Sequence, residues 1–238
     1  MSNDIVNNLA FLPLDLPEFV VSNDLVERLN RLYVEDSIND EYRNCKHIPI
    51  YITDGKDAKN YQGNHNLTWS KQSESLPEVV EYIKTNIFPW ANPMGRIMII
   101  CTKTKESNPV HIDCSPDKFN NTLQHKFRVV LNGRVDSLYF VNDNDSVRPT
   151  EIGNRPFMMS GSWPHGMNND NDQMKFTLAM GAPWESNLTD EYVDLINRSY
   201  AKYSDNYLSK KGWNLPENHI NLFNNKIYNE KTVQEQTY

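Results

Sequence analysis

The residues best suited to chemistry are His111 and Asp113, two positions apart, and a second histidine, His165, in the segment SGSWPHGM. In a strand, residues i and i+2 point to the same face, so His111 and Asp113 can hold one ion together. Turn residues Gly161 and Pro164 indicate that His165 approaches a strand sharply. Two imidazoles and one carboxylate suit Fe(II) and leave coordination positions for a co-substrate and O₂. By itself, the His-x-Asp pair has another interpretation: a surface histidine and aspartate at the end of a strand.

Two cations in apolar strands support the iron-site interpretation. Lys175 begins the apolar run Phe176–Met180, and Arg128 lies in the middle of KFRVVL. A cation directed into the interior is costly unless it has an anionic partner. The pair therefore predicts a buried dicarboxylate between the two strands. The alternative is that each charge lies on the solvent face of a half-exposed strand.

The order of these residues resembles that of the Fe(II)- and 2-oxoglutarate-dependent dioxygenases. Members have His-x-Asp, then a distant histidine, then Lys or Arg ten positions after that histidine. The stretch HIDCSPDKFNNTLQHKFRVVLNG, followed later by MMSGSWPHGMNNDNDQMKFTLAMGAPW, most resembles their aspartyl/asparaginyl hydroxylase-like and proline hydroxylase-like branches. The resemblance covers roughly residues 96–184. Some aspartyl hydroxylases lack the carboxylate ligand, whereas this chain has Asp113, so the resemblance to the superfamily is firmer than that to a branch.

The resemblance implies a role for each of these residues. It implies iron ligands at His111, Asp113 and His165. Lys175 would pair with the distal carboxylate of 2-oxoglutarate. Arg128, or alternatively His125 or Lys126, would lie near the other end of the co-substrate. The implied activity is hydroxylation of an amino acid, a peptide or another small polar substrate, with release of succinate.

Two other functions stay open at this point. One is a cupin-like metalloenzyme that uses the same ligands without 2-oxoglutarate, and the other is a non-catalytic jelly-roll binding module. Arg96, Arg134 and Arg155 are candidates to meet a carboxylate of the substrate, although most exposed arginines are simply solvated.

Three amphipathic segments predict helices over residues 22–35, 75–88 and 189–203. In the second segment, Ser75 and Glu78 form a capping-box pattern. The remaining apolar segments are short, β-branched or aromatic, and bounded by Asn, Asp, Gly or Pro, which is typical of strands. They cover residues 48–52, 96–103, 109–113, 126–132, 136–142, 156–160 and 173–181.

Helices, then strands, then a helix predict an α+β protein whose strands close into a double-stranded β-helix (jelly-roll or cupin-like) with flanking helices. We expect one domain over residues 1–212, with N-terminal and C-terminal helices, and a polar arm over 213–238. The chain has 238 residues, an ordinary size for a single domain.

The net charge of -7 argues against a broad surface for nucleic acid or for anionic membranes. The sequence shows neither a signal-peptide pattern nor a run of about 20 apolar residues, so we expect a cytoplasmic protein. The three cysteines, Cys45, Cys101 and Cys114, contain no CxxC pair and are expected to be reduced. The oligomeric state is left open.

Overall fold

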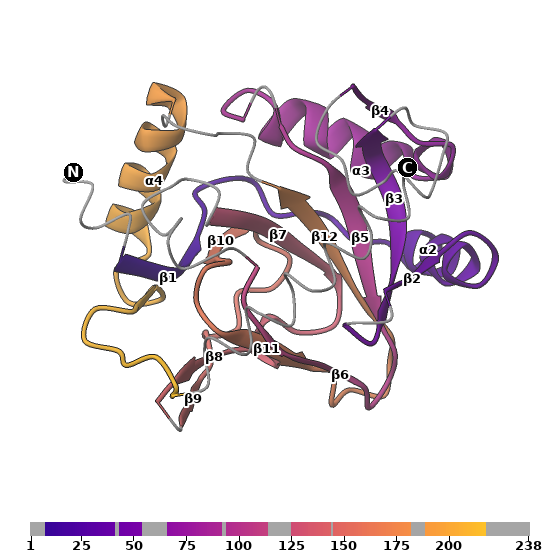
Figure 1. Ribbon diagram of the computed structural model, residues 1–238. Helices are drawn as coiled ribbons and strands as arrows, with labels where there is room; N and C mark the ends of the chain where they lie inside the picture. Colours follow the sequence, from indigo (N-terminus) through magenta and orange to yellow (C-terminus); the bar gives the residue numbers. More distant parts are fainter. Residues whose placement is uncertain are drawn as a thin grey trace.

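The computed structural model describes residues 8–40, 43–53, 66–91, 94–113, 125–143, 145–181 and 189–217. Their strands form two antiparallel sheets that lie one above the other in Figure 1. The larger sheet contains β1 (Leu9–Pro13), β2 (Ile38–Asp40), β3 (Cys45–Thr53), β4 (Leu67–Trp69), β5 (Ile97–Thr102), β7 (His125–Asn132), β10 (Phe157–Ser160), β12 (Lys175–Gly181) and β13 (Leu208–Ser209). The smaller sheet contains β6 (Ser107–His111), β8 (Leu138–Asn142), β9 (Asp145–Val147) and β11 (His165–Asn168).

From β5 to β12 the chain winds back and forth between the sheets. The order is β5-β12-β7-β10 within the larger sheet and β6-β11-β8-β9 in the smaller one. This alternation is the winding that the term double-stranded β-helix describes. The predicted α+β class, with a jelly-roll arrangement and flanking helices, is confirmed.

The two faces of the larger sheet have different neighbours. On β7, Phe127, Val129 and Leu131 belong to the main apolar core that the helices also enter, whereas Arg128 and Val130 face the smaller sheet. Because successive side chains of a strand point to opposite faces, Arg128 points away from the helix-side core although its neighbours Phe127 and Val129 belong to it.

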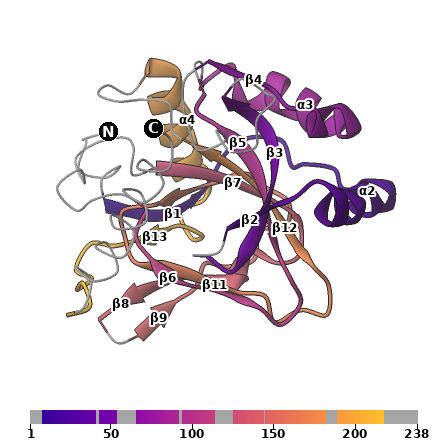
Figure 2. The ribbon, with the colours of Figure 1, turned by 45° about the vertical axis from the view of Figure 1, so that its right-hand side comes forward.

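Three helices cover the outer face of the larger sheet: α2 (Asn23–Glu35), α3 (Pro77–Tyr82) and α4 (Asp190–Lys202). In Figure 2, α2 and α3 lie beside each other, and α4 covers the end of the sheet near β1. The helix predicted over 22–35 begins after its Ser22 cap, and the one over 189–203 begins after Thr189. A π-helix, Ile83–Ile87, continues α3, so the predicted segment 75–88 is helical from Pro77 onward.

The predicted capping box of the second helix is wrong. Leu76 is the N-cap, and its side chain makes no capping hydrogen bond. Instead, Arg28 of α2 donates to the carbonyl of Ser75 and forms an ion pair with Glu78. The carboxylate of Glu78, which the local pattern assigned to the cap, thus pairs with Arg28 of another helix instead.

The strands that the pattern missed are short or lack alternation: β1, β2, β4, β9, β11 and β13. Strand β1 is buried along its whole length, because it packs between neighbouring strands with both faces covered. A two-residue period cannot appear in a strand that is buried on both sides.

Residues just past position 212 contact the smaller sheet. The ring of Trp213 lies 5.9 Å from that of Trp163 and 6.2 Å from that of Phe140, centroid to centroid. The rest of the predicted arm, 218–238, falls outside the described residues, as does Cys114. Cys45 and Cys101 are free and buried. Within the described ranges, every helix is too short or too polar to cross a membrane.

Candidate metal and co-substrate site

Strand pairing in the smaller sheet brings the two predicted histidine ligands together. His111, the last residue of β6, is the register partner of His165, the first residue of β11. Their rings lie 4.5 Å apart, centroid to centroid. The Nε2 atoms of His111 and His165 lie 3.6 and 3.7 Å from the carboxylate oxygens of Asp113. One ligand atom from each of the three residues lies within 4.8 Å of the others.

Asp113 reaches this position from outside the strand. The strand predicted over 109–113 ends at His111, and Asp113 lies in the bend that follows. Its backbone N–H donates to the carbonyl of Gly161 over 2.6 Å, which ties the bend to the turn between β10 and β11. An added Cβ on Gly161 would lie only 3.0 Å from Cβ of Asp113 and 3.1 Å from Cγ of Lys126. Any larger residue at position 161 would therefore press on Asp113 and Lys126.

Backbone carbonyls orient both imidazoles. Nδ1 of His111 lies 2.9 Å from the carbonyl of Pro109, and Nδ1 of His165 lies 2.7 Å from that of Trp163. If each Nδ1 carries the proton and donates to its carbonyl, each Nε2 presents a lone pair toward Asp113, which is how metal-binding histidines are commonly held. Pro109 is tolerated within β6 because β6 is an edge strand.

Burial keeps His165 neutral. It lowers the pKa of His165 to about 3, and the neighbouring His111 lowers it further against the opposing effect of Asp113. A neutral imidazole is the form that binds a metal, so His165 can act as a ligand across the neutral pH range.

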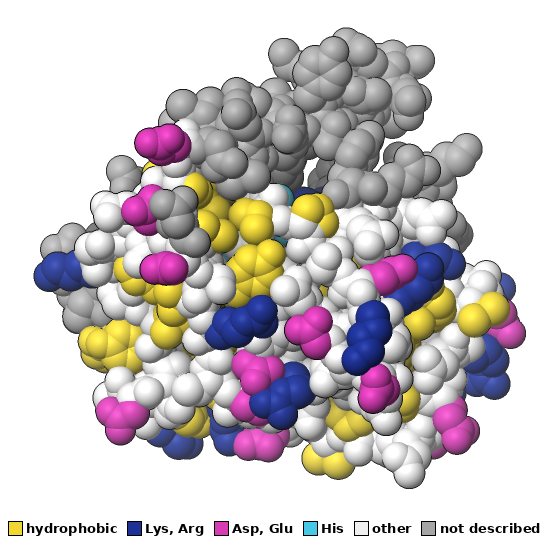
Figure 3. All heavy atoms as spheres, turned by 90° about the horizontal axis from the view of Figure 1, so that it is seen from below, with side chains coloured by type: hydrophobic (Ala, Val, Ile, Leu, Met, Phe, Trp, Pro, Cys, Tyr) yellow, Lys and Arg dark blue, Asp and Glu magenta, His cyan; other side chains and the backbone are white. Residues whose placement is uncertain are grey.

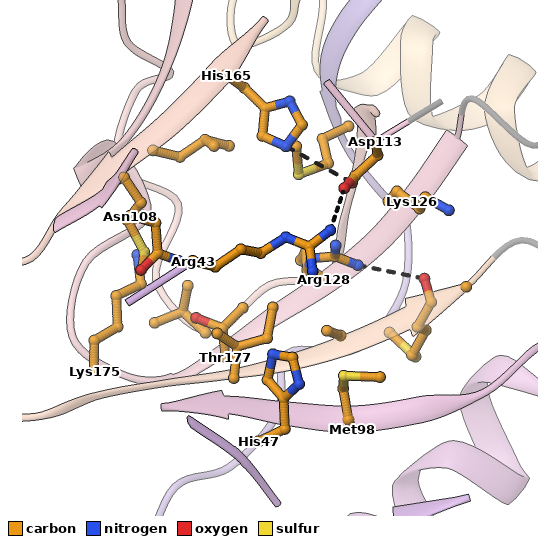
Figure 4. A pocket seen from close by; sticks show the side chains of 18 of the residues that line it. Arg43, His47, Met98, Asn108, Asp113, Lys126, Arg128, His165, Lys175 and Thr177 are labelled. Atoms are coloured by element: carbon orange, nitrogen blue, oxygen red, sulfur yellow. Dashed lines mark hydrogen bonds and ion pairs between the residues drawn. The ribbon is translucent and has the colours of Figure 1, made fainter. Parts of the chain in front are cut away.

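A cavity of about 180 Å³ lies between the two sheets and contains this triad. Figure 4 shows the side chains that enter it, and Figure 3 shows histidine and basic atoms at the bottom of a recess on the underside of the molecule. Its polar lining consists of Arg43, His47, Arg96, Asn108, His111, Asp113, Lys126, Arg128, His165, Lys175 and Thr177. The apolar lining includes Met98, Ile100, Val130, Leu138, Phe157, Met159 and Met167.

Lys175 lies in this cavity, on the inner face of β12, and is 2% exposed. Its ammonium donates to the carbonyl of Arg134 over 2.6 Å and to the hydroxyl of Ser137. Burial lowers its pKa to about 7, although Glu151 and Asp136 partly oppose this effect. A cation held at such a cost fits a site that receives an anion.

Arg128 and Lys126 also line the cavity, whereas His125 does not. His125 is on the opposite face of β7, where its Nδ1 lies 2.7 Å from the hydroxyl of Tyr192 on α4. The structure therefore removes His125 from the three residues considered for the co-substrate's other end.

Four polar residues of the cavity were not predicted from the sequence: Arg43, His47, Asn108 and Thr177. Arg43 contacts Asp113 over 3.4 Å and Asp40 over 2.8 Å. Thr177 Oγ1 and Asn108 Oδ1 are buried and have no hydrogen-bond partner among the described residues. Thr177 could have been found, because it lies two positions after Lys175 and so shares its face of β12. Nothing in the local sequence points to Arg43.

Of the arginines considered for a substrate carboxylate, only Arg96 lines the cavity. Arg134 is paired with Asp136, and Arg155 is paired with Glu18. Both pairs lie at the surface, which is the solvated alternative that the sequence left open.

Comparison with known proteins gives remote structural likenesses only. No protein-family model matches the chain, and no curated protein matches it significantly. A Trichoplax adhaerens prolyl hydroxylase, solved with a peptide of the hypoxia inducible factor oxygen degradation domain, is 14% identical, with a TM-score of 0.48 over 76% of this chain and 86% of that one.

Two bacterial structures are similarly distant. A Pseudomonas putida prolyl-4-hydroxylase is 11% identical, with a TM-score of 0.46 over 78% of this chain and 97% of that one. A Burkholderia pseudomallei oxidoreductase of the 2OG-Fe(II) oxygenase family is 10% identical, with a TM-score of 0.42 over 69% and 82%. Because all three likenesses are this remote, the function proposed below is argued from the site.

The close approach at Gly161 predicts a specific loss. In Gly161→Ala, the added methyl group must displace Asp113, and we expect metal affinity to fall by roughly 10- to 100-fold, the usual effect of disturbing the groups that orient a ligand. Anaerobic titration with Fe(II) would measure it. Gly181→Ala is the matched control, since the nearest atom to its methyl group would be the carbonyl oxygen of Arg96 at an ordinary 3.6 Å. Equal affinities in the two variants would contradict the prediction.

The lowered pKa of Lys175 predicts a pH-dependent stability. Between about pH 7 and its ordinary pKa of about 10.4, the unfolded chain binds the proton and the folded protein does not, so the free energy of unfolding should rise with pH in this window, by at most roughly 1.4 kcal/mol per unit of pKa shift. Lys175→Met should lack this rise and be at least as stable as wild type at pH 7. Urea unfolding at pH 7, 8.5 and 10 tests this, with the exposed Lys103→Met as control; parallel pH profiles for wild type and Lys175→Met would refute it.

Proposed function

We propose that this protein is an Fe(II)- and 2-oxoglutarate-dependent dioxygenase that hydroxylates a small polar substrate. One observation supports this most directly: a complete set of two imidazoles and one carboxylate lines the same cavity as the buried cation Lys175.

The triad fits a metal of the size and type of Fe(II). An ion about 2.1 Å from each of two ligand atoms separates them by about 3.0–3.5 Å. The Nε2–carboxylate distances of 3.6 and 3.7 Å are slightly wider, and the three ligand atoms lie within 4.8 Å of one another, so a bound ion would draw the side chains together. Three protein ligands leave further coordination positions for a co-substrate and O₂. Bound iron and 2-oxoglutarate would together supply the activation of O₂ needed to oxidise a C–H bond.

The opposite part of the lining fits the co-substrate. The ammonium of Lys175 and the hydroxyl of Thr177, on one face of β12, would bind the distal carboxylate of 2-oxoglutarate, with its keto acid end toward the triad. That carboxylate would satisfy the buried hydroxyl of Thr177 and restore the charge on Lys175 that burial opposes. Enclosure between two sheets would exclude water around these contacts.

These features also weigh against the two other functions. A binding module has no need for two facing histidines whose Nδ1 atoms both lie against backbone carbonyls. A metalloenzyme without 2-oxoglutarate has no need for a buried lysine in the same cavity. The test is to purify the protein without oxygen, add Fe(II) and 2-oxoglutarate, admit O₂ and measure succinate. Protein that binds stoichiometric iron but forms no succinate with any substrate tested would favour the cupin-like alternative. Protein that binds no iron would favour the binding module.

The metal ligands predict a severe loss with little effect on folding. His111→Ala, Asp113→Ala and His165→Ala should each lose bound iron and succinate formation, because an open metal site requires all three ligands. Their far-UV circular dichroism should match that of wild type. Full activity in His165→Ala would remove that residue from the ligand set.

Lys175→Ala tests the co-substrate assignment. Removing the cation leaves the carboxylate of 2-oxoglutarate unpaired in a desolvated pocket, which costs on the order of 2–5 kcal/mol. We therefore expect KM for 2-oxoglutarate to rise by tens-fold or more while iron binding is retained. Lys175→Arg should keep part of the activity, since the charge survives and the geometry changes. An unchanged KM in Lys175→Ala would place the anchor elsewhere.

A further inference from the structure

The cavity has a second cationic region beside Asp113. Arg43, Arg96 and Arg128, which we call the arginine cluster, line the cavity together with Lys126. In Figure 4 the guanidinium groups of Arg43 and Arg128 lie close to Asp113, whereas Lys175 and Asn108 lie on the other side of the view. Asp113 is the one carboxylate among the described residues that line the cavity.

Strand register separates this region from Lys175. Arg128 lies opposite Ala179, four positions along β12 from Lys175, which corresponds to roughly 13 Å along the strand. Electrostatics shows the same division. Besides burial, Asp113, Arg43 and Arg96 influence the pKa of Arg128, whereas Glu151 and Asp136 influence that of Lys175. Lys175 and Arg128 therefore start from well-separated positions along the sheet and are influenced by different carboxylates.

Arg128 has only neutral hydrogen-bond partners within the described part of the chain. Its Nη1 donates to the carbonyls of Phe127 over 2.9 Å and of Met180 over 3.4 Å. Burial lowers its pKa to about 10, against the opposing effect of Asp113. Arg43, by contrast, already bridges the carboxylates of Asp40 and Asp113. Unlike Arg43, Arg128 thus has a guanidinium edge left to bind a planar anion.

We propose that Arg128 binds a carboxylate of the substrate, and that the substrate is a small organic acid. This rests on the proposed function, in which Lys175 and the metal already neutralise the two ends of 2-oxoglutarate. The resemblance implied that Arg128 lies near the co-substrate. Its hydrogen-bond partners among the described residues are neutral carbonyls, and a negatively charged substrate would supply an anionic one. Arg43 and Arg96 add to the positive potential that selects an acid over its neutral amide.

The cavity favours a small acid over a long one. Its volume of about 180 Å³ is below the roughly 300–1,000 Å³ typical of ligand pockets, and 2-oxoglutarate must share it. A free amino acid or a short hydroxy or dicarboxylic acid fits this space.

The experiment uses protein loaded anaerobically with Fe(II) and saturating 2-oxoglutarate, so that ligands bind without turnover. The probes are the amino acids and C4–C6 hydroxy and dicarboxylic acids, each paired with its carboxamide, and acidic tetrapeptides. The first readout is the shift in thermal unfolding midpoint, because a ligand that binds the folded protein raises it. The second is succinate release after O₂ is admitted. The variants are Arg128→Met, Arg128→Lys, Lys175→Met and, as a control, the exposed Arg31→Met.

We expect at least one acid, but not its amide, to raise the midpoint and to stimulate succinate release in wild type and Arg31→Met. In Arg128→Met, the concentration of acid needed for either effect should rise by tens-fold or more, while KM for 2-oxoglutarate changes less than threefold. Arg128→Lys should recover part of the response to the acid. In Lys175→Met, KM for 2-oxoglutarate should rise by tens-fold or more while the response to the acid is retained.

Three results would overturn the inference: equal effects of acids and amides, a response to tetrapeptides alone, or a rise in KM for 2-oxoglutarate in Arg128→Met as large as in Lys175→Met. Failure of the proposed function is separate and appears as wild type that binds neither iron nor 2-oxoglutarate. The midpoint shifts still test Arg128 in that case, since they do not require turnover.

Discussion

The candidate site depends on the register in which β6 pairs with β11. This pairing sets His111 opposite His165, and the hydrogen bond from Asp113 N–H to the carbonyl of Gly161 then brings the carboxylate between the two imidazoles. A shift of one residue in this register would turn one histidine to the other face of the sheet. Strand β6, which contains Pro109, is at the edge of its sheet. Its pairing with β11 is therefore the one strand pairing that aligns His111 with His165.

The two faces of the larger sheet divide stability from function. The helix-side face belongs to a continuous apolar core that α2, α3 and α4 complete, with Phe127 packed against Trp90 and Tyr192. The inner face holds buried cations, including Arg128 and Lys175, whose burial opposes folding. The apolar surface buried on the outer face stabilises the fold and offsets the cost of burying these cations on the inner face.

In our proposal, the two ends of the cavity bind different anions. Lys175 and Thr177 lie near the start of β12, while Arg128 faces Asp113 from further along the same sheet. Asp113 also holds Arg43 in place, so the proposed metal ligand orders part of the arginine cluster as well. Co-substrate and substrate would then be selected by separate cations on either side of one metal, which keeps the two acids from exchanging places.

The sequence predicted that His111, Asp113, His165 and Lys175 belong to one site, from residue type, spacing and the family resemblance, and all four line one cavity. The two-residue period of a strand does not explain Asp113, which lies in the bend after β6. The sequence also predicted the jelly-roll class and most strands. Tertiary structure decided the rest. Arg43 enters the cavity from the turn before β3, and Glu78 pairs with Arg28 of another helix in place of its own cap. Contacts between distant segments depend on strand register and helix packing, which no local pattern contains.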